Sequence, residues 1–169
     1  DIPNEELFAK PSKAGRKTRT IDSFLRESGR AEAIWYPFTD VSWLKVWTVS
    51  PKKPASSRRV TSPYNYTFSD NLSDDTVTAT RNMVLGNPAI TPSFGNIQLQ
   101  ATAAGLAEGK ANDLWGKSKD LLLYLKPTTL RVTANGYAIH CRRKDVQRVI
   151  SEFTSYHEQH MAEYQAKGS

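Results

Sequence analysis

The sequence of 169 residues is 38% hydrophobic and 24% charged, which fits one globular domain or one part of a larger protein. It contains no apolar run near the roughly 18 residues of a membrane-spanning helix, and its start does not resemble a signal peptide. A single cysteine, Cys141, excludes an internal disulfide, and the sequence has no Gly-x-Gly-x-x-Gly motif for a dinucleotide.

The net charge of +6 raises the question of a nucleic-acid partner. Many of the lysines and arginines lie in residues 10–19 and 51–63, which also contain proline and serine and are typical of solvated loops. Because no aromatic-basic nucleic-acid motif accompanies them, we expect no nucleic-acid binding. The chain starts at Asp1 without a methionine and stops directly after a helical pattern, so we expect a piece of a longer polypeptide.

The first elements are a short helix at residues 21–27 and a β-hairpin. Residues 31–38 and 43–49 are rich in aromatic and β-branched side chains, and residues 39–42 between them suit a hairpin loop. That loop predicts four cross-strand pairs on one face of the sheet. The pairs are Phe38 with Trp43, Tyr36 with Lys45, Ile34 with Trp47, and Glu32 with Val49.

Two helices are predicted next. Residues 71–86 carry an N-cap candidate at Ser73 and stop signals at Gly86 and Pro88. Thr91, followed by a proline, repeats a helix start, and an alanine-rich stretch runs from there to Gly109.

The last third of the chain predicts strands and a long helix. Residues 121–125 are typical of a buried strand. The Asn135-Gly136 pair suits a type I′ turn and pairs residues 130, 132 and 134 with residues 141, 139 and 137. Residues 144–167 have apolar side chains at helical spacing. The fold class is therefore α+β: an antiparallel sheet of hairpins with helices packed on one face, including a long C-terminal amphipathic helix.

Two motifs give only weak indications of chemistry. Residues 111–118 end like a phosphate-binding loop, but Ala111 replaces its first glycine. His157 and His160 are spaced by three, whereas a zinc hydrolase motif spaces its histidines by four, and no third ligand is evident. We expect neither nucleotide nor metal binding, and Cys141 is interpreted as inert.

Glu32 is the strongest candidate for chemistry. On a strand it shares one face with Ile34, Tyr36 and Phe38, and an ionised carboxylate on an apolar wall is costly unless it is exposed, paired or functional. Two interpretations remain open. Glu32 is either an edge residue that reaches water or pairs with Lys45, or a carboxylate lining a flat apolar pocket, where it acts as acid, base or gate.

Several segments resemble the substrate-binding domain of bacterial cholesterol oxidases with covalently bound FAD, of the vanillyl-alcohol-oxidase type. The resemblance extends over nearly the whole chain, and these segments carry it. The segments are GRAEAIWYPFT (29–39), WLKVWTVSP (43–51), PYNY (63–66), FSDNL (68–72), NDLWG (112–116), SKD (118–120) and TTLR (128–131).

The resemblance implies that residues 1–169 are part of a single substrate-binding domain and that FAD is bound mainly by a domain outside this chain. It implies oxidation of the 3-hydroxyl of a sterol with molecular oxygen, and Glu32 as gate or base beside the steroid. The family's Glu-x-Arg partner has no match here. Ile34, Tyr36 and Trp47 are predicted to line the cavity because the hairpin places them on the face of Glu32.

The same resemblance implies further partners and a compartment. The partners are the sterol substrate, molecular oxygen, the FAD-binding domain of the same polypeptide and, for access to the sterol, a peripheral contact with a membrane. By the same resemblance, we expect a bacterial enzyme that is secreted from the cell. Two alternatives remain: the substrate domain of a flavin oxidase for another apolar alcohol, and a basic nucleic-acid-binding module.

Overall fold

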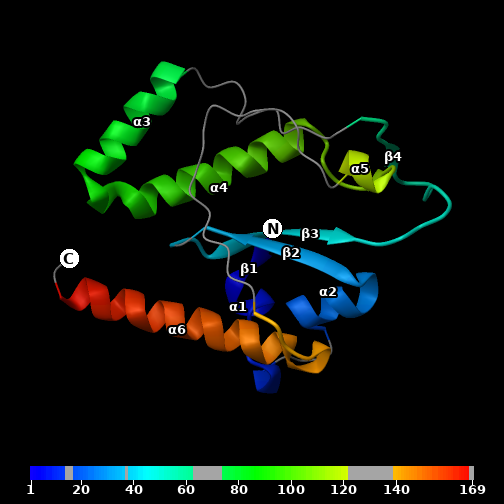
Figure 1. Cartoon of the computed structure of the whole chain (residues 1–169), viewed down its shortest axis with the longest axis horizontal. Coiled ribbons are helices and arrows are strands. Elements are labelled where there is room, and N and C mark those ends of the chain that lie inside the picture. Colours follow the sequence, from blue (N-terminus) through cyan, green and yellow to red (C-terminus); the bar gives the residue numbers. More distant parts are fainter. Residues whose placement is uncertain (14–16, 37, 63–73, 122–138, 168–169) are drawn as a thin grey trace. The chain divides into compact units, whose positions relative to one another are not determined.

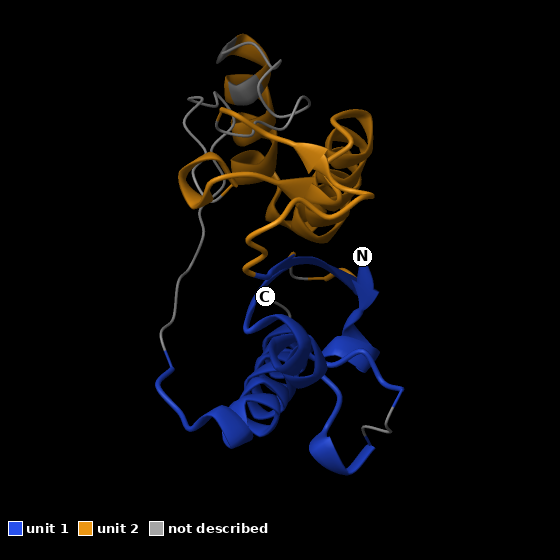
Figure 2. Cartoon of the chain, turned by 90° about the vertical axis from the view of Figure 1, so that its right-hand side faces the viewer, with its two compact units in different colours: residues 1–35, 40–48, 136–169 blue, residues 36–39, 49–135 orange. Residues whose placement is uncertain are grey.

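The computed structural model describes residues 1–13, 17–36, 38–62, 74–121 and 139–167. The chain forms two compact units, coloured separately in Figure 2. Unit 1 contains residues 1–35, 40–48 and 136–169, and unit 2 contains residues 36–39 and 49–135.

Unit 1 is built on a three-stranded antiparallel sheet (Figure 1). Its strands are β1 (Ile2–Pro3), β2 (Arg30–Trp35) and β3 (Val41–Trp47), in the order β1-β3-β2. In the hairpin, Glu32 lies opposite Lys45 and Ile34 lies opposite Trp43. The antiparallel hairpin predicted from the sequence is therefore present, with a different register.

Helices cover one face of this sheet, and Figure 1 shows them on the same side of β2 and β3. Leu7 is fully buried and forms the core with Ile2 and Phe8. Partly buried apolar residues from the sheet and helices pack against this core: Ile21, Phe24, Ala33, Trp35, Leu44 and Ile150. The helices are α1 (Asn4–Leu7), the 3-10 turn η1 (Pro11–Lys13), α2 (Ile21–Ser28), the 3-10 turn η3 (Arg143–Asp145) and α6 (Val146–Ala166).

The ends of α2 follow from its sequence. The Thr20 side chain accepts a hydrogen bond from the Ser23 amide at 3.1 Å, which satisfies one of the free N–H groups of the first turn. Gly29 ends the helix with φ 83, a left-handed conformation that glycine adopts without steric cost. The predicted helix at residues 21–27 is confirmed.

Unit 2 contains a pair of short parallel strands, β4 (Arg58–Arg59) and β5 (Leu114–Trp115). Its helices are α3 (Asp74–Gly86), the 3-10 turn η2 (Pro88–Ile90), α4 (Thr91–Glu108) and α5 (Ser118–Leu121). The helices predicted to end at Gly86 and to begin at Thr91 are confirmed. Residues 71–73, where the first was predicted to start, lie outside the described residues.

The predictions for the last third of the chain have mixed outcomes. The long helix is confirmed as α6, with residues 143–145 forming a 3-10 turn before it. Leu121 was predicted as strand but ends α5, because its amide donates to the Lys117 carbonyl in a helical turn. Ile139 and Cys141 have no regular secondary structure, and their predicted partners lie outside the described residues, as does the Asn135-Gly136 turn.

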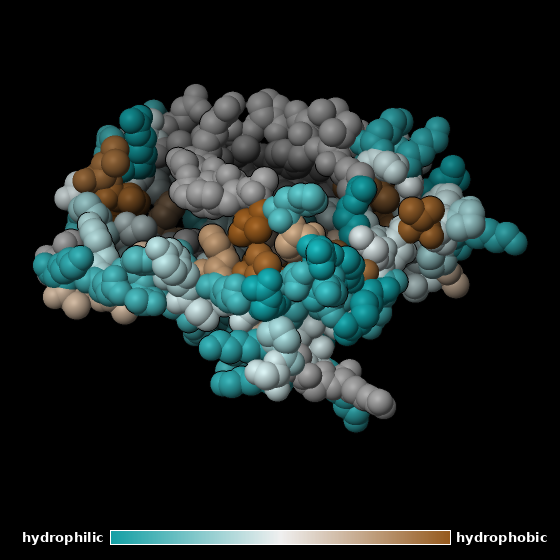
Figure 3. Space-filling view, turned by 60° about the horizontal axis from the view of Figure 1, so that its bottom comes forward, coloured by the Kyte–Doolittle hydropathy of each residue, from teal (hydrophilic) through white to brown (hydrophobic). Residues whose placement is uncertain are grey.

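The surface is mainly hydrophilic in the view of Figure 3, with separate apolar patches between the hydrophilic residues. Exposed apolar side chains are spread over several elements, as with Val46 on β3, Leu85 on α3 and Ile97 on α4. Across the described ranges, no helix has both the length and the apolar content that a bilayer crossing requires.

Candidate functional site: the aromatic face of the hairpin

The β2–β3 hairpin presents a second face, away from the core of unit 1. Ala33, Trp35 and Leu44 point into that core, so alternation along each strand directs their neighbours to the opposite side. This opposite side, called the aromatic face below, consists of Glu32, Ile34, Trp43, Lys45 and Trp47. It combines three large apolar side chains with one carboxylate and one ammonium group.

The two charged groups of the aromatic face form an ion pair. Glu32 Oε2 lies 2.9 Å from Lys45 Nζ, and the two residues are directly opposite each other in the register. The Glu32 side chain is 49% exposed and that of Lys45 is 28% exposed. Glu32 is thus paired and partly solvated. This matches the first of the two interpretations from the sequence, an edge residue that pairs with Lys45.

Aromatic rings flank the lysine. Its Nζ lies 4.9 Å from the centroid of the Trp43 ring and 5.8 Å from that of Trp47, within the range of cation–π attraction. Because these residues alternate along β3, all three side chains stand on one side of the strand. The Lys45 ammonium group therefore lies between the two indole rings and beside the Glu32 carboxylate.

Two of the three predicted lining residues, Ile34 and Trp47, lie on the aromatic face, and both are half-buried. Tyr36 does not, because β2 ends at Trp35. Tyr36 belongs to unit 2, where its hydroxyl is 3.2 Å from the Thr102 hydroxyl on α4. Its predicted place on the strand face is therefore wrong, whereas its predicted role in lining the cavity stays a prediction.

The predicted cross-strand pairs were also wrong, for a local reason. The Thr39 amide and hydroxyl both donate to the Tyr36 carbonyl, at 3.2 and 2.6 Å, which closes a turn before the predicted strand ends. Phe38 has φ 67, a left-handed conformation rare for a bulky side chain. Ile34 consequently lies opposite Trp43 instead of Trp47, although the two residues still share a face because the shift is even.

The two histidines of α6 make other contacts. The His157 ring packs against Trp35 with centroids 4.8 Å apart, and His160 lies 3.4 Å from a Glu163 carboxylate oxygen. In the described part of the chain, no three His, Cys, Asp or Glu side chains are grouped as a metal would require. These contacts are those of packed and surface residues.

The loop that resembles a phosphate site is also packed by the chain itself. Leu114 and Trp115 form β5, and the Trp115 indole N–H donates to the Ser50 carbonyl at 3.1 Å. A Cβ added to Gly116 would lie 2.6 Å from the Val60 carbonyl oxygen. The space on the Cβ side of this glycine is therefore filled by the backbone of Val60.

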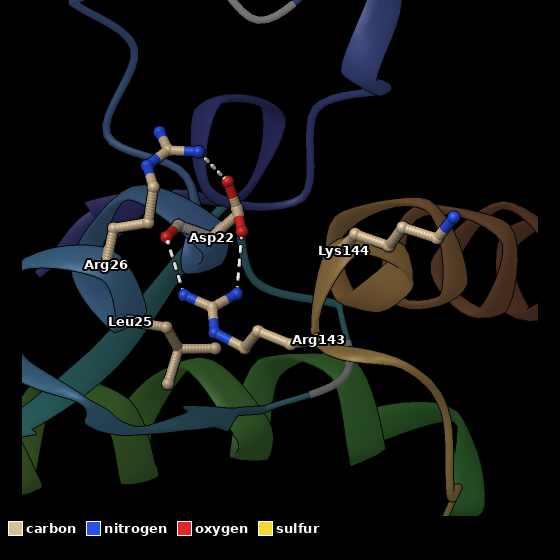
Figure 4. Close-up of a pocket in the computed structure, with 5 residues that line it drawn as sticks. All are labelled: Asp22, Leu25, Arg26, Arg143 and Lys144. Carbon is tan, nitrogen blue, oxygen red and sulfur yellow. Dashed lines mark hydrogen bonds and ion pairs between the residues drawn. The ribbon is translucent and has the colours of Figure 1, made fainter.

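A surface hollow in unit 1 was missed by the sequence analysis (Figure 4). It is lined by Asp22, Leu25, Arg26, Arg143 and Lys144. The Asp22 carboxylate is paired with Arg26 and, at 2.7 Å, with Arg143. The basic run at residues 142–144 was the only sequence signal for it. Because Asp22 pairs with both guanidinium groups, we interpret the cluster as a link between α2 and η3, the turn that leads into α6.

Comparisons with known proteins point in one direction. A family model described as "Cholesterol oxidase, substrate-binding" matches residues 1–169. A solved "Solvent-stable cholesterol oxidase" is 52% identical, with a TM-score of 0.86 over 99% of this chain and 31% of its own. A cholesterol oxidase from Brevibacterium sterolicum, solved as a His121Ala mutant, is 47% identical, with a TM-score of 0.85 over 100% of this chain and 31% of its own. A search of curated proteins found no match. The chain spans less than a third of the solved chains it matches.

Proposed function

This chain belongs to the cholesterol oxidase substrate-binding family, and we propose that it forms the sterol-binding part of a flavin-dependent oxidase. The reaction is oxidation of a sterol 3-hydroxyl to a ketone, with molecular oxygen reduced to hydrogen peroxide. The observation that carries the proposal is the aromatic face, a wall of Ile34, Trp43 and Trp47 with a carboxylate at its edge. Rigid apolar rings with one hydroxyl suit such a wall.

FAD supplies the hydride acceptor for this chemistry when it is bound. Within the described ranges, the segment closest in sequence to a phosphate cradle lacks the first glycine of that motif and packs Gly116 against the Val60 carbonyl, so it gives no support for a diphosphate site in this chain. This supports the proposal that FAD is held mainly by another domain of the same polypeptide. The residues of this chain then bind and orient the sterol.

Glu32 is proposed as the residue that gates the sterol site or accepts the hydroxyl proton. A carboxylate is suited to either role when it can leave one partner for another, and Glu32 is half-exposed beside Lys45. Ile34 and Trp47 are proposed to contact the apolar rings of the sterol. Contact with a membrane surface is proposed as the route by which sterol reaches the site.

The test is Glu32→Gln in the flavin-containing enzyme that carries this domain. We expect turnover with cholesterol to fall about 10²–10⁴-fold, the usual contribution of a proton-transfer group, with an unchanged flavin absorption spectrum. Glu27→Gln, which removes an exposed carboxylate from α2, is the matched control. If Glu32→Gln and Glu27→Gln had the same turnover and the same pH profile, the proposed role of Glu32 would be refuted.

The alternative of an oxidase for another apolar alcohol is tested with the same enzyme. We expect kcat/KM for cholesterol to exceed that for a short-chain alcohol by several orders of magnitude, because a small alcohol leaves most of the aromatic face exposed to water. Comparable kcat/KM values for the two substrates would favour the alternative.

A further inference from the structure

We propose that Lys45 is a positioning residue that holds the Glu32 carboxylate in place on the aromatic face. The proposal rests on the proposed function of Glu32 and adds a residue to it. Lys45 was expected from the sequence only as one possible ion-pair partner. The structure gives it three contacts on one face: the Glu32 carboxylate and two indole rings.

The strand register makes the pair a property of the fold. Lys45 lies directly across the sheet from Glu32, and Ile34 lies across from Trp43 in the adjacent pair on that face. Directly opposed residues of an antiparallel pair have Cβ atoms about 4.5–5.5 Å apart, so a lysine reaches a glutamate without leaving the face. The 2.9 Å separation of Nζ and Oε2 is that of a charge-assisted hydrogen bond.

The tryptophans restrict where the ammonium group can go. An exposed Lys–Glu pair is usually worth little, since holding two long side chains in one geometry costs entropy. Here the Trp43 and Trp47 rings lie before and after Lys45 on the same strand face, with centroids 4.9 and 5.8 Å from Nζ. The rings favour the same lysine conformation that the carboxylate does, so less side-chain entropy is lost when the pair forms.

The pair also explains how the carboxylate can be both fixed and available. Lys45 is less exposed than Glu32, 28% against 49%, so the cation is seated in the face while the carboxylate stays open on one side. Arg30 lies two residues before Glu32 on the same side of β2, outside the five residues of the aromatic face, and is exposed. Lys45 therefore anchors Glu32, and substrate approaches the free side of the carboxylate.

The test compares Lys45→Met with Lys45→Arg in the flavin-containing enzyme. Methionine keeps an unbranched apolar stem against the tryptophans but removes the cation, whereas arginine keeps a cation that also stacks on indole rings. We expect Lys45→Met to lower kcat with cholesterol about tenfold with a smaller change in KM, and Lys45→Arg to recover most of the loss. Lys52→Met, at an exposed loop lysine, is the matched control.

The double variant Lys45→Met/Glu32→Gln separates positioning from packing. If Lys45 acts through Glu32, its substitution has no further effect on kcat once Glu32 is glutamine. An undiminished loss in the double variant, failure of arginine to recover activity, or a Lys45→Met enzyme equal to Lys52→Met would each overturn the proposal. A Glu32→Gln enzyme with normal turnover would instead refute the proposed function, because the lysine would have no catalytic partner to position.

Discussion

Gly116 shows how a single missing side chain permits a close approach of two backbone segments in unit 2. A Cβ at this position would lie 2.6 Å from the Val60 carbonyl oxygen, and the Val60 amide donates to the Trp115 carbonyl next to it. We expect Gly116→Ala to lower the free energy of unfolding by about 1–3 kcal/mol, because the β4–β5 pair must shift.

Gly86 provides the matched control for that substitution. It ends α3, and a Cβ there would have no heavy atom within 4 Å. Gly86→Ala should leave stability unchanged or raise it by up to about 1 kcal/mol, since alanine favours helix. Urea unfolding of both variants measures the difference, and equal midpoints would contradict the close approach at Gly116.

The ion pair of Glu6 with Arg19 makes the stability of the fold depend on pH in the acidic range. The Arg19 side chain, and then the Arg19 amide, donate hydrogen bonds that hold the pKa of the Glu6 carboxyl below its usual value. A depressed pKa means stability that is present above the unfolded value, about 4.3, and is lost as the pH falls through the folded value. Glu6→Gln should therefore flatten the fall of the unfolding midpoint below about pH 4.

Arg19→Gln checks the cause of this effect. It removes the guanidinium contacts and keeps the amide contact, so it should flatten the acid dependence partly. The midpoints are followed by circular dichroism between pH 2 and 7. If the acid dependence of Glu6→Gln matched that of the unsubstituted chain, the ion pair would not contribute to stability.

The sequence predicted correctly which residues share a face of the sheet with Glu32, but it did not predict which residues lie opposite each other across the two strands. Alternation along a strand depends only on parity, so Glu32, Ile34 and Trp47 were placed on one face correctly. The pairing depends on where the turn closes, which is decided by the Thr39 hydroxyl bond to Tyr36 and the left-handed Phe38. Phe38 is not a standard turn residue and Thr39 is a weak one, but Pro37 directly before them is a turn residue that the prediction placed within the strand.

At the scale of elements, Gln147 connects three segments of unit 1. Its amide nitrogen donates to the Leu7 and Ala9 carbonyls at 3.1 and 2.8 Å, and its oxygen accepts from the Asp22 amide at 3.1 Å. The side chain is buried, so truncation would leave these backbone groups without partners. We expect Gln147→Ala to lower the free energy of unfolding by about 2–4 kcal/mol.

Gln159→Ala, on the same helix, is the control for Gln147. Among the described residues its amide bonds to Glu163 one turn away, and it is exposed, so its loss should cost less than about 0.5 kcal/mol. Thermal unfolding of both variants gives the comparison. Similar losses would mean that Gln147 does not join α1, α2 and α6.

The elements themselves could be predicted where local chemistry sets their ends. Thr20 and Gly29 bound α2 as a cap and a left-handed stop, and Thr91 with its following proline starts α4. Leu121 was misassigned because a short apolar run fits a strand or a buried helix equally well. The Gln147 contacts join residues more than a hundred positions apart, which no local pattern reveals.

At the scale of the whole molecule, unit 1 is assembled from three separate stretches of chain. Its core takes Leu7 from the first stretch, Leu44 from the second and Ile150 from the third. Composition indicated one globular region and could not show this interleaving. That residues 1–169 form part of a single domain stays a prediction.

The interleaving predicts which part of α6 the fold requires. Buried and core-packing residues of α6 are confined to its first half, with Gln147, Ile150, Ser151 and Thr154, and residues 162–167 are exposed. A chain ending at Arg142 would lose all of these contacts. We expect it to leave the hairpin without protection against amide hydrogen exchange, although residues 30–47 are intact.

A chain ending at Met161 is the control for this truncation, because it shortens the chain but keeps the packed residues of α6. It keeps Gln147, Ile150 and the His157 ring against Trp35, so we expect the β2–β3 amides to exchange as slowly as in the 169-residue chain. The sheet carries little of its own stability, since a two- or three-stranded sheet needs a covered face to persist in water. Slow exchange of the hairpin in the chain ending at Arg142 would therefore show that α1 and α2 alone cover that face, and that α6 is not required to hold Glu32 and Lys45 in register.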